Sequence, residues 1–593
     1  MKAFAAAVAM AMATVSTIPL TAAAAATTPQ AQSPEDARFK AIYSEEWAWR
    51  QHQMADDEDS GDRISAHLPD VGPAAQAAKL KKWTEVLAEL DKLDPAKLSP
   101  ENQVNLEVYR NQIAMLLGSQ RYRDYERPLN ADTSFWGNVA GTARQHFKTE
   151  QDYRNYISMM RDIPRYFDQQ MANMKEGEAR GFTPPKITLE GRDATVTPIT
   201  EAKTPEDNPF YAPFKKMPDT IPAATQAQLR AEAVAAIRDA VVPAHKKLLG
   251  FLRDDYIPHA VTAIDAYSLP DGKAYYQFKI KEFTTLDLTP QQIHQIGLEE
   301  VAKIHQQMLD VMKEVGFKGD LPAFLTYLRT DPRFYAKTPM ELLKDAAWIA
   351  KKFDGKASTW FGRLPRSRFA IIPVPADIAP FYTGGRGGPG VYLVNTYNLP
   401  SRPLYSLTAL TLHESAPGHA FQMPLAAENK DLPPFRRDTY ISAYGEGWAL
   451  YCEKLGVEMG MYETPYDRFG MLSYQAWRAS RLVVDTGIHA MGWSREQAQK
   501  YLHDNTALAD HEIQTEVDRY IAWPGQALSY YLGEKTILDD RAKAEKALGP
   551  KFNIRAFHDT VLQMGSVPLP VLTARIDRFI AEGGKGPYPD EEK

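Results

Sequence analysis

Residues 406–422, SLTALTLHESAPGHAFQ, decide how the rest of the chain is interpreted. An apolar run leads directly into the adjacent His413 and Glu414, and a second histidine, His419, follows six residues after the first. Imidazole and carboxylate groups this close together are typical of metal centres, where the HExxH pattern sets two histidines four residues apart on one helical face. The spacing here is longer, so a regular helix does not produce that arrangement.

The proline and glycine between the histidines are the expected place for a distortion. Six residues of straight α-helix turn through about 600°, which leaves His419 roughly 120° from the face of His413. Pro417 lacks an amide N–H and Gly418 permits unwound geometry, so we expect a bulge or a break that returns His419 to a shared ion. His413 and His419 are then metal ligands and Glu414 is the general base that activates water. The alternative is an ordinary polar pair on a helix.

A third carboxylate follows in residues 444–455, YGEGWALYCEKL. Glu446 and Glu453 are seven residues apart and therefore lie nearly on one helical face. An acidic group among Trp448 and Leu450 is costly to bury unless it pairs with a cation or a metal. We predict Glu446 as the third ligand, Glu453 as a supporting or solvated group, and Zn2+ as the metal.

A helical stripe further along the chain offers a candidate oxyanion donor. Arg481, Asp485 and His489 follow one another at four-residue steps. Such a stripe is either a salt-bridged structural face or a means by which Asp485 presents His489 to the oxyanion of a tetrahedral intermediate. The second interpretation makes His489 a catalytic residue.

Two phenols and a guanidinium follow in residues 518–531, DRYIAWPGQALSYY. Tyr530 or Tyr520 is a candidate oxyanion donor, and Arg519 is a candidate partner for a substrate carboxylate. Tyrosines in a helical stripe are alternatively part of a packed core. We predict Tyr530 as a catalytic residue and Arg519 as a substrate-binding residue.

Strand patterns are concentrated just before the His–Glu motif. Residues 368–374 and 390–396 are predicted as strands, and the glycine-dense residues 382–390 between them form either a flexible turn or backbone exposed for substrate contact. We expect the strand at 391–396 to be an edge to which an extended peptide pairs, with Tyr392 and Asn395 as substrate-binding residues.

Helix-start patterns dominate the remainder and predict a mainly α-helical protein. Ser33, Thr289 and Thr338 each precede a proline and a first turn with an acidic or amide side chain, and Ser494 with Gln497 forms a further capping box. We divide the chain into a helical N-terminal lobe at residues 33–280 and a catalytic lobe at 281–593, with the option of one continuous domain, around a small β-sheet beside the active-site cleft.

The first residues and the composition bear on location and partners. Residues 1–26 carry a lysine, an apolar run and an alanine-rich end, the layout of a cleaved signal peptide rather than a membrane anchor, so we expect a periplasmic or secreted protein. The one cysteine, Cys452, has no partner for an intrachain disulfide. No cysteine follows the apolar run, so lipid attachment at a cleaved N-terminus is not expected. A net charge of -6 favours neither nucleic acid nor membrane as partner, and the oligomeric state stays open.

Four separated motifs together resemble a known family. HESAPGHAFQ (413–422), YGEGWALYCEKLG (444–456), RLVVDTGIHAMGWSREQA (481–498) and WPGQALSYYLG (523–533) resemble the bacterial family called domain of unknown function 885. That family is similar to zinc metallopeptidases with a glutamate as third ligand, in the style of thimet oligopeptidase and carboxypeptidase Taq. The resemblance implies a mainly α-helical, two-lobed fold around a deep cleft, with His413 and His419 as ligands and Glu414 as base.

The sequence therefore predicts an exported zinc-dependent peptidase with a short peptide as substrate. Two alternatives use the same residues. One is a zinc hydrolase of another amide, such as a cell-wall or modified amino-acid derivative, and the other is a non-catalytic peptide-binding protein, which would have no use for Glu414.

Overall fold

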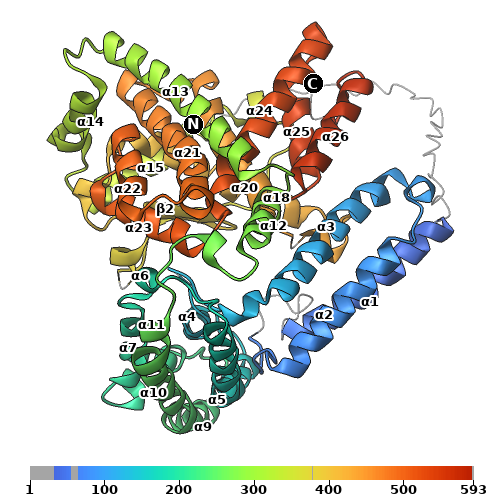
Figure 1. The fold of residues 1–593 in the computed structure, drawn as a ribbon, viewed down its shortest axis with the longest axis vertical. Helices are drawn as coiled ribbons and strands as arrows, with labels where there is room; N and C mark the ends of the chain where they lie inside the picture. Colours follow the sequence, from blue (N-terminus) through green and yellow to red (C-terminus); the bar gives the residue numbers. More distant parts are fainter. Residues whose placement is uncertain (1–32, 55–63, 132, 377, 438, 591–593) are drawn as a thin grey trace, which may run out of the picture.

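The computed structural model describes residues 33–54, 64–131, 133–376, 378–437 and 439–590. The predicted signal peptide at 1–26 lies outside these residues. The fold is mainly helical with one small sheet, as the sequence predicts (Figure 1). Within the described part of the chain, none of the helices has the length and apolarity needed to cross a membrane.

The N-terminal half of the described chain contains only helices, with shorter turns between them. Their bounds are α1 Pro34–Met54, α2 Pro73–Leu90, α3 Pro100–Tyr122, α4 Phe135–Gly141, α5 Glu150–Ala179, α6 Lys186–Leu189, α7 Thr197–Thr200, α8 Ala212–Lys215, α9 Ala223–Ala236, α10 Val242–Phe251, α11 Ile257–His259, α12 Gly272–Thr284 and α13 Pro290–Glu314.

The C-terminal half holds the sheet and the helices that carry the candidate site. The elements are α14 Leu321–Thr330, α15 Pro339–Asp354, α16 Ala357–Trp360, β1 Ala370–Pro373, β2 Gly385–Gly388, β3 Val391–Val394, α17 Leu407–Glu414, α18 His419–Glu428, α19 Pro434–Arg437, α20 Ser442–Glu458, α21 Pro465–Met491, α22 Arg495–Asn505, α23 Asp510–Ala522, α24 Ser529–Leu548, α25 Ile554–Gln563 and α26 Leu569–Ala581.

The predicted helix starts are confirmed. Helices α1, α13, α15 and α22 begin one residue after Ser33, Thr289, Thr338 and Ser494 respectively. The Thr289 hydroxyl accepts a hydrogen bond from the Gln292 amide while the Gln292 side chain accepts from the Thr289 amide, and the cap of α22 has the same reciprocal form. Local capping chemistry thus fixes where these helices begin.

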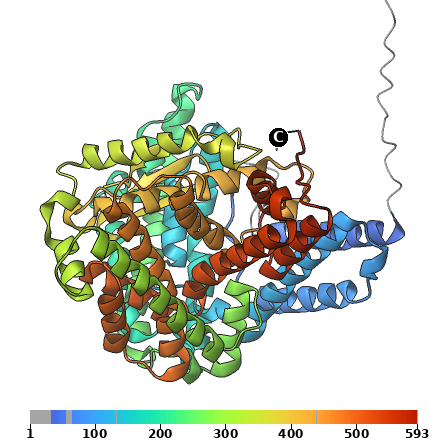
Figure 2. The same cartoon turned by 90° about the horizontal axis from the view of Figure 1, so that it is seen from above.

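The buried apolar residues group into clusters that do not follow the predicted boundary at residue 280. One cluster draws on residues 64–71 and 129–260, and its helices, such as α5, α9 and α10, form the lower part of Figure 1. Helices α1, α2 and α3 instead share a second cluster with helices from α15 to α26. Figure 2 shows α1 to α3 extending from that C-terminal body, beside α24 and α26.

Glycines allow the two helices nearest the site to pack backbone against backbone. Gly447 of α20 and Gly533 of α24 face each other so closely that a Cβ on Gly447 would lie 2.5 Å from the Gly533 Cα, and one on Gly533 would lie 1.9 Å from the Ala443 carbonyl oxygen. This contact holds α20, which carries Glu446, against α24, which carries Tyr530.

The sheet has the strand order β1–β3–β2, with β1 parallel and β2 antiparallel to β3. The prediction that residues 391–396 form an edge strand is wrong, because β3 is central and its backbone groups already pair on both sides. The glycine-dense segment supplies a further strand: residues 385–388 form β2, which is one of the two edge strands.

Candidate metal centre

The helix that enters the His–Glu motif breaks after Glu414, and a new helix begins at His419. Between them the Ala416–Pro417 peptide bond is cis, and the Gly418 amide donates to the Leu412 carbonyl at 3.0 Å. A Cβ on Gly418 would lie 1.8 Å from the His413 carbonyl oxygen. Only glycine fits here, so this residue sets how closely α18 approaches the end of α17.

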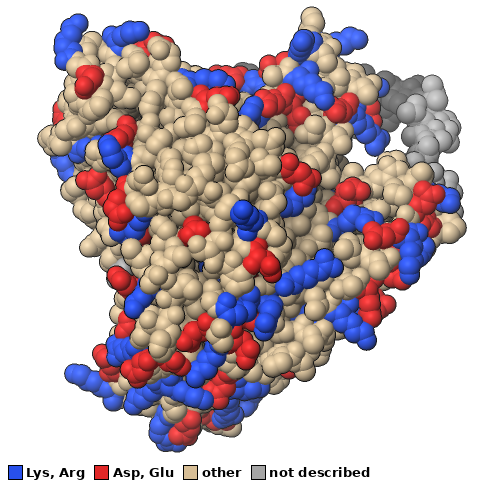
Figure 3. All heavy atoms as spheres, in the orientation of Figure 1, with Lys and Arg blue, Asp and Glu red and all other residues tan. Residues whose placement is uncertain are grey.

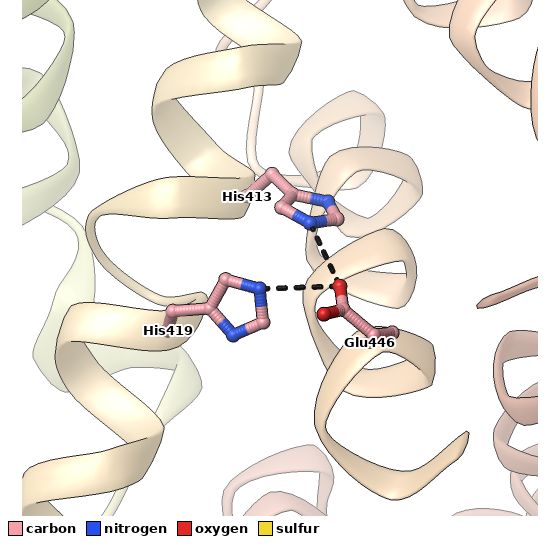
Figure 4. Close-up of side chains that lie close together, drawn as sticks. All are labelled: His413, His419 and Glu446. Atoms are coloured by element: carbon pink, nitrogen blue, oxygen red, sulfur yellow. Dashed lines mark ion pairs between the residues drawn. The ribbon is translucent and has the colours of Figure 1, made fainter. Parts of the chain in front are cut away.

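The break brings three side chains to one point (Figure 4). His413 ends one helix, His419 begins the next, and Glu446 comes from the neighbouring α20. The Nε2 atoms of His413 and His419 lie 3.4 and 3.3 Å from the same carboxylate oxygen of Glu446, Oε2. The two imidazole rings are nearly perpendicular, with centroids 5.0 Å apart. The structure thus brings together the three residues that the sequence predicts as ligands.

The spacing of these atoms fits a tetrahedral zinc ion. Zinc bonds of about 2.0–2.1 Å separate neighbouring ligand atoms by about 3.3–3.4 Å, and the two measured histidine–carboxylate separations are of that size. Two imidazoles and one carboxylate leave a fourth position for water, as catalytic zinc sites require. The residues therefore fit the metal that the sequence analysis predicts.

Glu453 fixes the orientation of one ligand. Its Oε1 lies 2.7 Å from the Nδ1 of His413, so a proton on Nδ1 leaves the Nε2 lone pair directed at the cluster. Glu453 is fully buried, and its other neighbour is the Arg478 guanidinium at 3.7 Å. Of the two roles left open for Glu453, the structure therefore favours the supporting one. The Nδ1 of His419 has no hydrogen-bond partner among the described residues.

Glu446 and Glu453 stabilise positive charge in the cluster. Burial alone would lower the pKa of His413, but its hydrogen bonds to Glu446 and Glu453 outweigh burial and raise that pKa to about 10. Burial also opposes ionisation of Glu446, yet the charge of His419 and the hydrogen bonds of both histidines hold its pKa well below the usual range. The same field favours a bound cation.

Glu414 lies against the edge strand. The Gly387 amide of β2 donates to Glu414 Oε2 at 2.6 Å, and a Cβ on Gly387 would lie 1.7 Å from the Glu414 carbonyl oxygen. Glycine in β2 therefore lets the strand and the end of α17 touch. The contact places Glu414 between the edge of the sheet and the adjacent His413.

Tyr440 is a site residue that the sequence analysis missed. Its hydroxyl donates to the second carboxylate oxygen of Glu446, Oε1, at 3.0 Å, and its ring packs over Gly445. Although 48% of the side chain is exposed, its pKa is raised well above the usual value, first by loss of solvation at the hydroxyl and then by the charge of Glu446. The charges of Tyr530 and Glu414 raise this pKa further.

His489 does not form the predicted pair with Asp485. Its Nδ1 accepts a hydrogen bond from the Ala266 amide at 3.1 Å and its Nε2 donates to the Tyr520 carbonyl at 2.9 Å, while the ring is fully buried. Asp485 instead accepts from the Tyr276 hydroxyl at 2.6 Å and from the Gly525 amide. With both nitrogens bonded to backbone, His489 has no N–H left for an oxyanion, and the structural interpretation of this stripe holds.

The phenols and guanidinium of the last motif lie in one hydrogen-bonded group. Arg519 donates to the Tyr530 hydroxyl at 3.2 Å and to Gln526 at 2.7 Å, and its Nη1 lies 3.4 Å from Glu516. Tyr520 is buried, and its hydroxyl accepts from Arg481 at 2.9 Å, so it belongs to the core. Tyr530 instead contributes to the raised pKa of Tyr440, the phenol that is hydrogen-bonded to Glu446.

Two predicted substrate-binding residues, Tyr392 and Asn395, are buried on or directly after β3. Tyr392 is fully buried, with its hydroxyl 3.4 Å from Thr411. Asn395 is fully buried as well, and its amide nitrogen donates to the carbonyls of Ala379, Tyr382 and Thr383. Tyr392 therefore contacts the protein in place of a ligand. Asn395, which directly follows β3, also lines the cavity beside the site, so its role in substrate binding stays a prediction.

Other features of the described surface are weaker candidates. Glu178, Asp255 and His259 also lie close enough to share an ion, but Lys175 already pairs with Asp255 at 3.1 Å and His259 is exposed. On the face drawn in Figure 3, basic and acidic side chains are intermixed, without a continuous patch of one sign. A cavity of about 370 Å3 lies beside the His–Glu cluster rather than on it.

Fold and site together define a mainly helical protein with a candidate metal centre of two histidines and one glutamate. The chain belongs to the family described as "Bacterial protein of unknown function (DUF885)", whose model matches residues 55–576. The comparison with curated proteins gave no match.

Two solved structures are similar to this chain. One is a "putative lipoprotein" from Colwellia psychrerythraea, with a TM-score of 0.85 and 26% identity over 93% of this chain and 100% of that one. The other is a "putative lipoprotein of unknown function" from Shewanella oneidensis, with a TM-score of 0.67 and 16% identity over 91% of this chain and 99% of that one. At 16% identity the second likeness concerns the fold alone.

Proposed function

We propose that this protein is a zinc-dependent peptidase in which His413, His419 and Glu446 hold the metal and Glu414 is the general base. One observation carries the proposal: two imidazole Nε2 atoms converge on a single carboxylate oxygen at 3.4 and 3.3 Å, beside a further glutamate. A random helical pair of histidine and glutamate has no reason to form this geometry across a helix break.

The chemistry divides between the ion and the chain. Zinc, when bound, lowers the pKa of a bound water to about 7 and polarises the carbonyl to be cleaved. Glu414 accepts a proton from the attacking water as the carbon–oxygen bond forms, and then delivers that proton to the leaving amine as the carbon–nitrogen bond breaks. The Gly387 amide at 2.6 Å holds the Glu414 carboxylate in place for both transfers.

The edge strand β2 is the proposed binding site for the peptide backbone. It pairs only with β3 among the described strands, and it lies along α17 beside Glu414. Its sequence, Gly-Arg-Gly-Gly, has few side chains to keep a second chain away. An extended peptide that adds to this edge would present its carbonyl groups to the centre by main-chain hydrogen bonds.

Tyr440 and Tyr530 are the proposed donors to the oxyanion that forms at the cleaved carbonyl. The Tyr440 O–H, which donates to Glu446 Oε1 at 3.0 Å in this structure, would turn from the carboxylate to the oxyanion. Tyr530 receives a hydrogen bond from Arg519 that leaves its own proton available. A phenol that donates to developing negative charge stabilises the transition state more than the ground state. This assignment replaces His489.

The setting of the enzyme follows from its sequence and its relatives. A signal-like segment at residues 1–26, together with similarity to the structure from Colwellia psychrerythraea that is described as a lipoprotein, supports an exported protein in the periplasm or the medium. We further propose that the helical fold is the two-lobed, metallopeptidase-like type and that short peptides are its substrates.

Hydrolysis of a peptide library by the zinc-loaded protein tests the proposal. Glu414→Gln is expected to retain one zinc ion per chain and to lower kcat by about 100- to 10,000-fold, the usual contribution of a general base. Glu107→Gln, which changes an exposed glutamate on α3, is the matched control and retains full activity. Equal activity of Glu414→Gln and wild type, or no hydrolysis of any library peptide by wild type, would refute the proposal.

A further inference from the structure

A cavity of about 370 Å3 lies along the seam between the sheet and α17. Its lining includes Gly384, Leu410 of α17, Arg402, Tyr474 and Glu512. Leu410 precedes Glu414 by four residues, so the cavity lies about 6 Å along the helix from the proposed base. An extended peptide advances about 3.3 Å per residue, so a group one or two residues from the cleaved bond reaches the cavity.

Arginine side chains whose charges act on Glu512 have more hydrogen-bond donors than the described residues satisfy. Arg478 and Arg481 are 4% and 2% exposed. Among the described residues, Nε and Nη1 of Arg478, Nη1 of Arg481 and Nε of Arg402 have no hydrogen-bond partner.

The guanidinium groups of Arg478 and Arg481 lie over the rings of Trp477 and Tyr530, at 3.9 and 4.3 Å, which accounts for part of their unpaired donors. Arg402, which lines the cavity, has no such contact with a ring in the described part of the chain. Because buried donors normally have partners, its unpaired Nε points to an acceptor that arrives with a ligand.

The carboxylates nearby do not neutralise these arginines. Glu453 is shared between His413 at 2.7 Å and Arg478 at 3.7 Å. Glu516 is likewise shared between Arg481 at 2.8 Å and Arg519 at 3.4 Å. Arg402 forms no ion pair with any described residue, and its Nη1 reaches only the Ser401 carbonyl, at 3.4 Å. An excess of positive charge therefore remains beside the cavity.

Glu512 does not remove the excess. It lines the cavity and lies in the field of Arg402, Arg478 and Arg481, yet it forms no ion pair or hydrogen bond with any residue in the described ranges. Burial first, and then the neighbouring Glu516, raise its pKa to about 7 against the opposing arginines. Near neutral pH a large fraction of Glu512 is thus uncharged and offers an O–H rather than a negative charge.

We propose that this cavity is a subsite for a carboxylate of the substrate, with Arg402 as its principal partner. The inference rests on the proposed function and deepens it: the preferred peptides carry an anionic group one or two residues from the cleaved bond. Guanidinium and carboxylate groups match in shape and charge, and their hydrogen bonds are about twice as strong as neutral ones. The carboxylate comes either from a free C-terminus or from an acidic side chain.

Equilibrium binding to the zinc-loaded Glu414→Gln variant tests the subsite without turnover. Three probes separate the sources: acetyl-trialanine with a free carboxylate, its C-terminal amide, and acetyl-Ala-Glu-Ala amide. At least one anionic probe is expected to bind about 10- to 100-fold more tightly than the neutral amide, since a charge-assisted hydrogen bond contributes to that extent. The probe that shows the preference identifies the source.

The preference is expected to disappear when Arg402→Gln is added. Arg333→Gln, which removes an exposed arginine that does not line the cavity, is the matched control and keeps the preference. Arg402→Lys retains the charge without Nε and gives an intermediate preference, which keeps the test valid if Arg402→Gln does not fold. Equal binding of all three probes, or a preference that survives both Arg402 substitutions, would overturn the subsite. If the wild-type protein hydrolyses no peptide but the Arg402-dependent binding preference is present, only the peptidase proposal is refuted.

Discussion

Replacing Gly418 with alanine tests how the helix break builds the metal centre. The added Cβ would lie 1.8 Å from the His413 carbonyl oxygen. Because such atoms pack no closer than about 3 Å, the ends of α17 and α18 must move apart by about 1 Å. His419 is the next residue and moves with α18, whereas zinc bonds tolerate only about 0.2 Å of error. Loss of a hydrogen-bond partner of a metal ligand lowers metal affinity about 10- to 100-fold. We expect displacement of the ligand His419 itself to lower zinc affinity by at least that factor.

Competition with a chromophoric zinc chelator measures this affinity directly. Gly141→Ala is the matched control, since a Cβ there meets nothing within 4 Å and the residue has a helical φ of -59°. The control is expected to bind zinc as wild type does, and a thermal melt separates local displacement from unfolding. If Gly418→Ala binds zinc with wild-type affinity, the close packing of α18 against His413 does not position His419 as a zinc ligand.

Three further predictions follow from individual contacts. Glu453→Gln weakens the acceptor for the His413 Nδ1 proton and should lower zinc affinity about 10- to 100-fold by chelator competition, with unchanged affinity counting against an orienting role. Tyr440→Phe removes the hydroxyl from Glu446 and should lower kcat about 10- to 1,000-fold at unchanged zinc content; a rise in KM alone would contradict the oxyanion role. Burial lowers the pKa of His245 to about 4 in the folded protein, against about 6.5 in the unfolded chain. The contribution of neutral His245 to the free energy of unfolding is therefore present above about pH 6.5 and is lost as pH falls toward 4. Between these values His245→Gln should reduce the pH slope of the unfolding free energy by about 1.4 kcal/mol per pH unit in urea titrations, and an unchanged slope would show that His245 does not titrate there.

Local physics explains what the sequence predicts correctly. The caps at Thr289 and Ser494 involve atoms three residues apart, so their patterns fix the helix starts without knowledge of the fold. The mismatch between six residues and the helical repeat likewise requires a distortion at Pro417–Gly418, and the structure breaks there. Helical periodicity places Glu446 and Glu453 on one side of α20, and both reach His413.

Tertiary competition explains what the sequence does not predict. The four-residue spacing of Asp485 and His489 puts them on one face of α21, but the Tyr276 hydroxyl and the Gly525 amide bind Asp485, and backbone groups from distant segments bind His489. Strand β2 has no alternating apolar pattern, because it consists of glycines and one arginine, and so its pairing with β3 is not visible locally. Once β2 takes the edge, Tyr392 and Asn395 become buried core residues.

The site depends on approaches between helices that periodicity cannot show. Tyr440 precedes α20 and reaches Glu446 because its ring packs over Gly445. Gly447 and Gly533 let α20 and α24 touch, and Tyr530 of α24 raises the pKa of the same hydroxyl. Sequence alone offers a partial indication, since glycines flank Glu446 and one follows Tyr530 by three residues.

Anomalous X-ray scattering at the zinc edge, measured on crystals of the zinc-loaded protein, shows whether His413, His419 and Glu446 hold the metal. We predict one strong peak per chain, about 2.0–2.2 Å from His413 Nε2, His419 Nε2 and a carboxylate oxygen of Glu446. A peak elsewhere, such as between Glu178, Asp255 and His259, with none at the helix break, would contradict the account.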